Sequence, residues 1–426
     1  MNDAALSAFE RLFGPEFGHG ESLDLARLSA ALEKLGRPEK RLPNVIHVAG
    51  TNGKGSTIAF MRAIAEAGGL RVHAFTKPHL LKLNERFLVA GEIVSDEQLI
   101  ATAARVAAIS TAITQFDAQA AAAFLLFAET PADLILIETG MGGRLDSTNV
   151  VASAVSVITP IAVDHQDALG DTIAEIAAHK AGIIRHGRPV VVARQSDEAS
   201  QVIEARAMQL SAPLLREGVE WDAFANAGRL LVQTETETFD LPLPSLFGAH
   251  QIANAGLAVA TLAVGDIALP NEAFAQGVAN ARWPARLQPL TRGPFSAPIR
   301  AVGGEVWVDA GHNAHAAAAL ARALTEMRAK RGGANIAIIG MRRRKDAAQF
   351  IAALEHAVDR IIAVPLSEDH IEPVRIAGLG LDLDVTSEIA PSLAAAMQSA
   401  AQLPAPRVLI CGSFVLAAEA LAAESA

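Results

Sequence analysis

The segment Asn44-Val-Ile-His-Val-Ala-Gly-Thr-Asn-Gly-Lys-Gly-Ser56 decides the fold of the first half of the chain. Its β-branched start predicts a strand, and a helix-compatible stretch over 56–67 follows the glycines. Backbone N–H groups in such a loop, with a helix N-terminus behind them, form a cradle for anions, and Lys54 can reach the outer phosphates of a nucleotide. The segment therefore predicts a phosphate-binding loop at 50–56. The alternative is a glycine-rich connection with a chance lysine.

Outward from this loop, short apolar runs alternate with alanine-rich helical stretches. A leucine pattern over Leu23–Leu35 predicts a helix that ends at Gly36, and strands are expected at 71–76, 133–138, 154–159 and 189–193. Such alternation is typical of a parallel sheet covered on both faces. Between 230 and 243 polar and apolar residues alternate, which predicts antiparallel β structure, and helical character returns over 249–266.

A second α/β series begins after the breaks at Trp283-Pro284 and Gly293-Pro294. It contains expected strands at 306–310, 335–339, 360–364 and 407–411, with helices beginning near 314 and 346. We predict an α/β protein with an N-terminal P-loop ATPase domain over 1–288, built on a mostly parallel sheet, and a C-terminal Rossmann-like α/β domain over 289–426.

Composition narrows the class of protein. The 426 residues include 36 Lys and Arg against 46 Asp and Glu, a net charge of −10, which argues against a broad nucleic-acid-binding surface. The single cysteine, Cys411, cannot form an internal disulfide and fits a reducing compartment. The first seven residues lack the features of a signal peptide, and no apolar run is long enough to span a membrane. We expect a cytoplasmic protein without membrane or nucleic-acid partners.

Three further segments carry candidate chemistry at strand ends. Glu138 ends the apolar run 134–137 and is placed to hold magnesium, although a surface carboxylate is the alternative. Asp164-His165 follows the strand that ends near 159, on the edge where ligands gather in open α/β sheets; an Asp-His pair can also be a simple loop hydrogen bond. Lys180 lies on a helix expected near the same edge, where it could equally be a snorkelling lysine.

Together these motifs resemble a known family. They are Ala49-Gly-Thr-Asn-Gly-Lys-Gly-Ser56, Pro78-His-Leu80 with Asn84-Glu-Arg86, Glu138-Thr-Gly-Met-Gly-Gly-Arg-Leu-Asp146, Asp164-His165, His179-Lys-Ala-Gly-Ile183 and Asp309-Ala-Gly-His-Asn313. In this order they resemble the folylpolyglutamate synthase/dihydrofolate synthase family of the Mur ligase superfamily. The resemblance runs from about residue 23 to Cys411-Gly-Ser-Phe414, and therefore covers nearly the whole chain.

The resemblance implies a role for each matching position. Lys54, His165 and Lys180 would be catalytic, and Lys180 would be carbamylated. Magnesium, as one ion or two, would be held by Ser56, Glu138 and His165. ATP would be bound by Thr51, Asn52, Gly53, Lys54, Gly55, Ser56, Asn254, Arg286, Asp309 and His312. The pterin-bearing substrate would contact Thr114, Gln115, Phe116, Asp117, Leu145, Asp146 and Ser147. Phe116 offers a ring for stacking, although its spacing also suits a core aromatic.

The sequence departs from the family pattern at two main positions. Lys77 precedes Pro78-His79 where the family usually has a serine that resembles a magnesium ligand, and an ammonium group cannot coordinate a metal. Water could fill that position, the Lys77 cation could partly replace the ion, or the loop could be displaced. Ala285 stands where glycine commonly precedes the arginine at 286, which puts the geometry of that loop in question. The basic run 342–345 is either a solvated loop or an attractor for an anionic substrate.

The resemblance implies an ATP-dependent amide ligase that joins L-glutamate to dihydropteroate, to a folate, or to both through an acyl phosphate. Its partners would be these small molecules with ATP and Mg²⁺, and a monomer would suffice. The alternatives are another amino-acid ligase of the Mur superfamily and a P-loop nucleotide switch that is not a ligase. A switch would have no need of Lys180 or of Asp309 in a second domain.

Overall fold

The computed structural model describes residues 3–16, 24–110, 112–265 and 267–425 and divides into two compact units. The first unit comprises Met1–Ser245 and Ile252–Arg282, and the second comprises Leu246–Gln251 and Trp283–Ala426. The domain boundary predicted at 288/289 stays a prediction, and the chain passes between the two compact units at Arg282/Trp283, with Leu246–Gln251 also in the second unit.

The first unit is built on an eight-stranded sheet in the order β4-β3-β2-β5-β1-β6-β7-β8. The run from β2 through β5, β1, β6 and β7 to β8 is parallel, while β3 and β4 extend one edge in antiparallel pairing. The bounds are β1 (Val45–Ala49), β2 (Val72–Phe75), β3 (Phe87–Val89), β4 (Glu92–Ile93), β5 (Leu134–Glu138), β6 (Val155–Ile158), β7 (Val190–Val192) and β8 (Leu214–Arg216). The expected mostly parallel sheet is confirmed.

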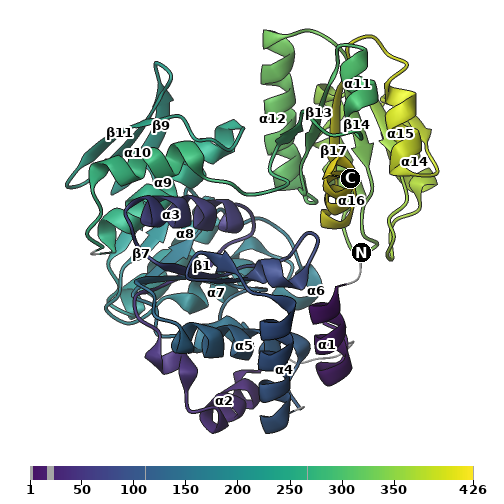
Figure 1. The fold of residues 1–426 in the computed structure, drawn as a ribbon. Coiled ribbons are helices and arrows are strands. Elements are labelled where there is room, and N and C mark those ends of the chain that lie inside the picture. The colour runs from purple at the N-terminus through teal and green to yellow at the C-terminus, as the bar shows by residue number, and fades with distance from the viewer. Residues whose placement is uncertain (1–2, 17–23, 111, 266, 426) are drawn as a thin grey trace. The chain divides into compact units, whose positions relative to one another are not determined.

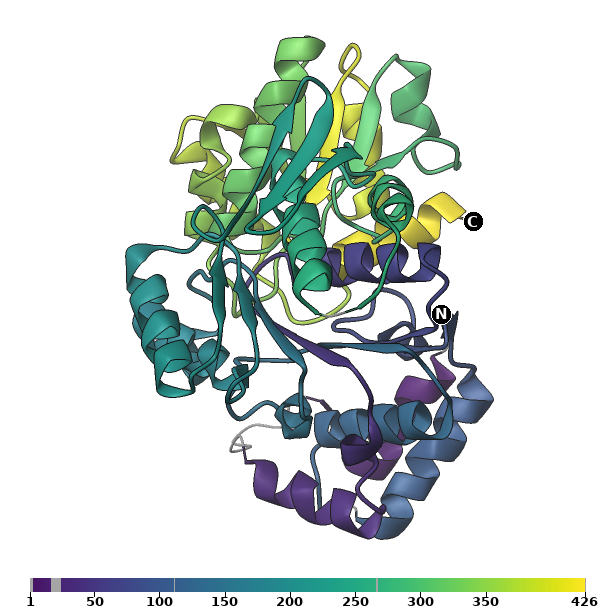
Figure 2. The ribbon, with the colours of Figure 1, turned by 90° about the vertical axis from the view of Figure 1, so that its left-hand side faces the viewer.

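Helices cover both faces of this sheet. Figures 1 and 2 show α3 on one face and α4 and α5 on the other. This double cover buries β1 and β5 on both faces, which explains their unbroken apolar runs. The helices are α1 (Ala4–Phe13), α2 (Leu25–Lys34), α3 (Lys54–Ala67), α4 (Asp96–Ile109), α5 (Gln115–Glu129), α6 (Gln166–Leu169), α7 (Ile173–Lys180), α8 (Asp197–Gln209), α9 (Ala249–Val264) and α10 (Asn271–Asn280). Of the leucines predicted to form the helix before Gly36, Leu23 lies outside the described residues.

A small antiparallel sheet completes the first unit. It has the order β11-β10-β9, with β9 (Trp221–Asn226), β10 (Arg229–Thr234) and β11 (Thr238–Pro242). The alternation read at 230–243 therefore marks two of its strands, and β9 lies before the predicted segment. The buried side chains of β10 and β11, among them Leu230, Val232 and Phe239, alternate with more exposed ones, as expected for a sheet with one solvated face.

The second unit contains a six-stranded sheet in the order β12-β13-β17-β14-β15-β16, in which β12 alone of these strands is antiparallel to its neighbour. Its strands are β12 (Gln288–Leu290), β13 (Glu305–Val308), β14 (Asn335–Ile339), β15 (Arg360–Ala363), β16 (Thr386–Ile389) and β17 (Arg407–Cys411). Its helices are α11 (Ala297–Ala301), α12 (Ala314–Lys330), α13 (Ala347–Ala352), α14 (Pro373–Leu381), α15 (Leu393–Ala400) and α16 (Phe414–Ser425). The predicted Rossmann-like α/β series is confirmed.

Candidate active site

The glycine-rich loop joins β1 to α3, and its glycines are required by close packing. Gly50 has φ +141°, and a Cβ there would lie 1.9 Å from Thr159 Oγ1. Gly53 has φ +91°, and a Cβ there would lie 2.5 Å from Asn254 Oδ1. Asn254, on α9, therefore lies directly against the loop. Side chains larger than glycine would change the path of the backbone at both positions.

Lys54 folds back over this loop. Its Nζ donates to the carbonyl oxygens of Gly50 at 3.1 Å and Thr51 at 3.2 Å, and it lies 3.7 Å from Glu138 Oε1. Glu138 ends β5, which pairs in parallel with β1, so both strands deliver their carboxyl ends to one edge. The structure thus brings together the two residues that the sequence predicts at the phosphate-binding end. We refer to Gly50, Lys54, Glu138 and Lys180 as the phosphate-end cluster.

Lys180, at the end of α7, reaches the same loop. Its Nζ donates to Gly50 O at 2.8 Å, and the residue is 5% exposed. Burial, assisted by the nearby ammonium group of Lys54, lowers the pKa of Lys180 to about 7, although Asp164 and Asp146 act in the opposite direction. A buried amine that is partly uncharged near neutral pH is a nucleophile, in contrast to an ordinary surface lysine.

The proposed metal ligands differ in how tightly they are held. Ser56 is buried in the first turn of α3, and Glu138 is 4% exposed, with Oε2 accepting a hydrogen bond from the Lys77 amide at 3.1 Å. The His165 side chain is half exposed, and its Nε2 lies 3.9 Å from Asp164 Oδ1. Within the described ranges no group of three or more His, Cys, Asp or Glu side chains forms a ready metal site. The donors nevertheless fit Mg²⁺, which commonly takes one or two carboxylates and completes its shell with phosphates and water.

The residues predicted to bind the pterin lie around the first turn of α5. Thr114 caps this helix and Asp117 returns the capping hydrogen bond, while Asp117 Oδ1 also accepts from Ser147 Oγ at 2.6 Å. Asp146 accepts hydrogen bonds from the Met141 amide at 2.7 Å and from Thr148. Burial raises the pKa of Asp146 despite these hydrogen bonds. Both carboxylates therefore already hold loops in place.

The same first turn of α5 carries Gln115 and Phe116. Gln115 is buried, and its Oε1 accepts from Gln119 at 3.4 Å. The Phe116 ring packs so closely on Gly140 that a Cβ there would lie 2.5 Å from the ring. Leu145 is half-buried. The predicted substrate residues thus form one neighbourhood around Phe116 and Asp146.

The remaining predicted ATP residues gather in the second unit. Asp309, just after β13, accepts hydrogen bonds from the Leu287 amide at 2.8 Å and the Gly311 amide at 2.7 Å. Arg286 lies over the Phe414 ring at 5.3 Å, and the His312 ring lies 5.6 Å from the same ring. Phe414 was not predicted as a site residue. An aromatic directly after the Cys411-Gly-Ser turn is the signal that could have found it.

The sequence left open the geometry of the loop at Ala285 and the role of the basic run 342–345, and the structure describes both. Ala285 is buried with φ +54°, so the loop keeps a left-handed backbone that favours glycine, although alanine occupies the position. In the basic run, Arg342 pairs with Glu368, and Arg343 Nε lies 2.7 Å from Asp369 Oδ1. Acidic partners thus already neutralise part of that run.

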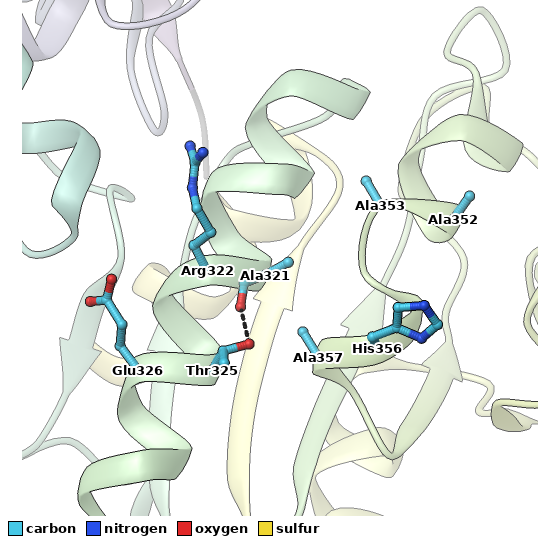
Figure 3. A pocket seen from close by; sticks show the side chains of 8 residues that line it. All are labelled: Ala321, Arg322, Thr325, Glu326, Ala352, Ala353, His356 and Ala357. Atoms are coloured by element: carbon cyan, nitrogen blue, oxygen red, sulfur yellow. Dashed lines mark hydrogen bonds between the residues drawn. The ribbon is translucent and has the colours of Figure 1, made fainter.

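A cavity of about 370 Å³ in the second unit lies away from all of these residues. Figure 3 shows it between α12 and the segment from α13 to residue 357, with small side chains such as Ala321 and Ala357 facing it. Thr325 donates its hydroxyl to Ala321 O at 2.9 Å, and His356 is exposed. The lining holds no nucleophile–base pair or carboxylate pair, so we do not treat this cavity as the active site.

A glycine-rich loop after β1, an acidic strand tip and a second α/β unit are the features expected of an ATP-dependent Mur ligase. The chain matches the Mur ligase middle domain over residues 48–262 and the Mur ligase glutamate ligase domain over 298–414. The helices that the structure describes are all too short or too polar to span a bilayer.

Similar proteins show to which family of Mur ligases the chain belongs. The dihydrofolate synthase/folylpolyglutamate synthase of Bacillus subtilis is 37% identical over 71% of this chain and 72% of its own length. The structure of Escherichia coli FolC in complex with DHPP and ADP has a TM-score of 0.87 at 31% identity and covers 99% of this chain and 98% of its own. The bifunctional enzyme of Yersinia pestis with AMPPNP and Mn ion has a TM-score of 0.87 at 32% identity, with 100% of each chain covered. The chain belongs to the folylpolyglutamate synthase/dihydrofolate synthase family and is an ATP-dependent amide ligase.

Proposed function

We propose that this ligase joins L-glutamate to dihydropteroate, to a reduced folate, or to both, with ATP as the energy source. The observation that carries the proposal is the phosphate-end cluster, in which Lys54 lies 3.7 Å from Glu138 on a loop whose positive φ values and close contacts favour glycine at Gly50 and Gly53. The relatives' names and the DHPP and ADP bound to E. coli FolC support this choice of substrates.

In the proposed reaction the carboxylate of the acceptor acid attacks the γ-phosphorus of ATP, and the bond between that phosphorus and the bridging oxygen of ADP breaks. Lys54 would neutralise charge on the transferred phosphoryl group. The amine of glutamate then attacks the acyl carbon and loses a proton, and the tetrahedral intermediate expels phosphate to leave an amide. Mg²⁺, as one ion or two, would supply further charge neutralisation, with Ser56, Glu138 and His165 holding it.

Other residues would bind the substrates. ATP would be contacted by the loop 50–56 and by Asn254, Arg286, Asp309 and His312. The acceptor acid would be contacted by Thr114, Gln115, Phe116, Asp117, Leu145, Asp146 and Ser147. We further propose a cytoplasmic location, which the single, buried Cys411 supports, and a monomer as the active form.

We also propose that Lys180 is carbamylated. Its lowered pKa of about 7 leaves a fraction of uncharged amine at neutral pH. That amine can attack the carbon of CO₂, forming an N–C bond and releasing a proton. The carbamate would be an anion beside the Lys54 ammonium, which replaces a repulsion by an attraction. ¹³C NMR of the protein in labelled bicarbonate should show a carbamate signal that Lys180→Met lacks; a signal that persists in that variant would exclude Lys180.

The experiment that tests the function measures ADP release with dihydropteroate or tetrahydrofolate, each with and without L-glutamate. We expect release that requires both an acceptor acid and glutamate, and the acid that supports it identifies the activity. Equal release with neither substrate would indicate a nucleotide hydrolase or switch. Release with glutamate replaced by another amino acid would favour a different ligase of the superfamily.

A further inference from the structure

The backbone amide and the side-chain ammonium group of Lys77 contact two different parts of the first unit. Its backbone amide donates to Glu138 Oε2 at 3.1 Å, at the phosphate end. Its ammonium group lies 2.9 Å from Glu16 Oε1 and 4.2 Å from the centroid of the Phe116 ring. The side chain therefore extends to the ring predicted to bind the pterin, where an ammonium group and an aromatic face attract each other.

Glu16 holds this ammonium group in place, although no motif contains it. Burial opposes ionisation of Glu16, but the cations Lys77 and Arg86 hold its pKa well below the ordinary range. Arg86 Nη2 lies 3.0 Å from Glu16 Oε2, and the side chains of Arg86 and Glu16 are 4% and 10% exposed. Since both oxygens of Glu16 are paired with cations, its carboxylate is a fixed anchor for Lys77.

Arg86 is in turn fixed by two neutral partners. It donates through Nη1 to Gln119 Oε1 at 2.6 Å and through Nε to His79 Nδ1 at 3.0 Å. Burial and the charge of Arg86 lower the pKa of His79 to about 4, so the ring is neutral at pH 7 and Nδ1 can accept. The position of Lys77 thus follows from a chain of contacts that begins with Gln119 on α5, the helix that also carries Phe116.

We propose that Lys77 is a specificity-determining residue for the acceptor acid: its ammonium group, seated on the Phe116 ring and positioned by Glu16, donates a hydrogen bond to an acceptor atom of the pterin-bearing acid. The inference rests on the function proposed above. A hydrogen bond from a charged donor in a partly buried site contributes roughly ten- to hundredfold in affinity. An ammonium group does not ligate metal, so this role replaces the metal contact expected of the serine that the family usually has at this position.

The test compares Lys77→Met, which keeps the length of the side chain without its charge, with Glu16→Gln and with the matched surface control Lys34→Met. Initial rates with the acceptor acid that supports turnover, dihydropteroate or tetrahydrofolate, at saturating ATP and glutamate give KM and kcat. Calorimetry with AMPPNP gives nucleotide affinity, and Mn²⁺ electron paramagnetic resonance counts bound metal. We expect Lys77→Met to raise KM for the acid roughly ten- to hundredfold while nucleotide affinity and metal count stay unchanged.

Glu16→Gln should raise the same KM by a smaller factor, and the double variant should be no worse than Lys77→Met alone, because Glu16 acts through Lys77. An unchanged KM in Lys77→Met would overturn the proposal, as would a loss confined to nucleotide affinity or metal count. If Glu16→Gln fails to fold by thermal melting, Lys77→Met alone decides. Wild-type protein without acid- and glutamate-dependent turnover would instead overturn the proposed function.

Discussion

The phosphate-end cluster and the residues around Phe116 and Asp146, the acceptor-acid neighbourhood, are both in the first unit, but they are built differently. At the phosphate end, backbone geometry dominates: Lys54 and Lys180 both donate to the carbonyl oxygen of Gly50. Around Phe116, side chains dominate, and Lys77 owes its position to the carboxylate of Glu16. A motif therefore specifies the first region locally, whereas the second depends on residues that the fold brings together from separate segments.

The largest expected effect lies at the phosphate end. Lys54→Ala removes the charge that would stabilise the transferred phosphoryl group, and we expect kcat to fall by roughly 10²–10³-fold or more. The control Lys34→Ala changes an exposed lysine on α2 and should leave kcat unchanged. Thermal melting checks that both variants fold. Near-normal turnover by folded Lys54→Ala would remove this lysine from the mechanism.

The next prediction tests whether the acceptor-acid neighbourhood can be altered without affecting the phosphate-end cluster. Gly140→Ala places a methyl group 2.5 Å from the Phe116 ring, so the ring must move. We expect KM for the acceptor acid to rise roughly tenfold or more, with unchanged affinity for nucleotide, because misplacing a binding group by about 1 Å is costly. Gly378→Ala on α14 is the matched control, since a Cβ there meets nothing within 4 Å. Equal losses for acid and nucleotide would show that the regions are not independent.

A pH profile probes the burial of Lys180. Its folded pKa of about 7 lies below the unfolded value of 10.5, so between these values the unfolded chain binds more protons. Below pH 7 the cost of burying the charge is fully present, and it is relieved as pH rises. In CO₂-free buffer, the free energy of unfolding of the wild type relative to Lys180→Met should therefore rise between pH 7 and 10, by up to about 1.4 kcal/mol per pH unit. Parallel urea-unfolding profiles would mean that Lys180 is not buried as an amine.

The smallest effect concerns Ala285, the second departure from the family pattern. Glycine would relieve a left-handed backbone cost of roughly 1–2 kcal/mol but lose about 0.8 kcal/mol of methyl burial. Ala285→Gly should therefore stabilise the protein by roughly 0.2–1.2 kcal/mol. Ala227→Gly, at an exposed turn with φ +48°, loses no buried methyl and should stabilise it more. Urea unfolding that ranks the two variants in the reverse order would contradict this account of the loop.

The sequence predicts most strands of the sheets and the glycine-rich loop, for physical reasons. Buried parallel strands such as β1 and β5 are continuous apolar runs, and the loop after β1 places its glycines where left-handed backbone requires them. Of the strands that the sequence did not predict, β3, β4, β8 and β12 are two or three residues long, and β9 and β16 are longer; all of them except β3 lie at a sheet edge, where little apolar pattern is needed. Short edge strands carry too few buried residues to set a period.

The candidate site also has a part that the sequence predicts and a part that it does not. Lys54, Glu138 and Lys180 stand at element ends that the chain order already marks, and the structure brings them together. Glu16 lies in no motif, and its partners Lys77 and Arg86 are about 60 to 70 residues away in sequence. Contacts between side chains of such separation arise only from the tertiary fold, so no local pattern could have predicted the anchor of Lys77.

We propose that phosphoryl transfer at the phosphate-end cluster activates the acceptor carboxylate. The decisive experiment follows turnover of the accepted acid, dihydropteroate or a reduced folate, labelled with ¹⁸O in both oxygens of the reacting carboxylate, with mass analysis of the products. We expect one ¹⁸O atom in each released phosphate, because the oxygen that attacks the γ-phosphorus leaves with it. Unlabelled phosphate accompanying amide formation would contradict the proposal.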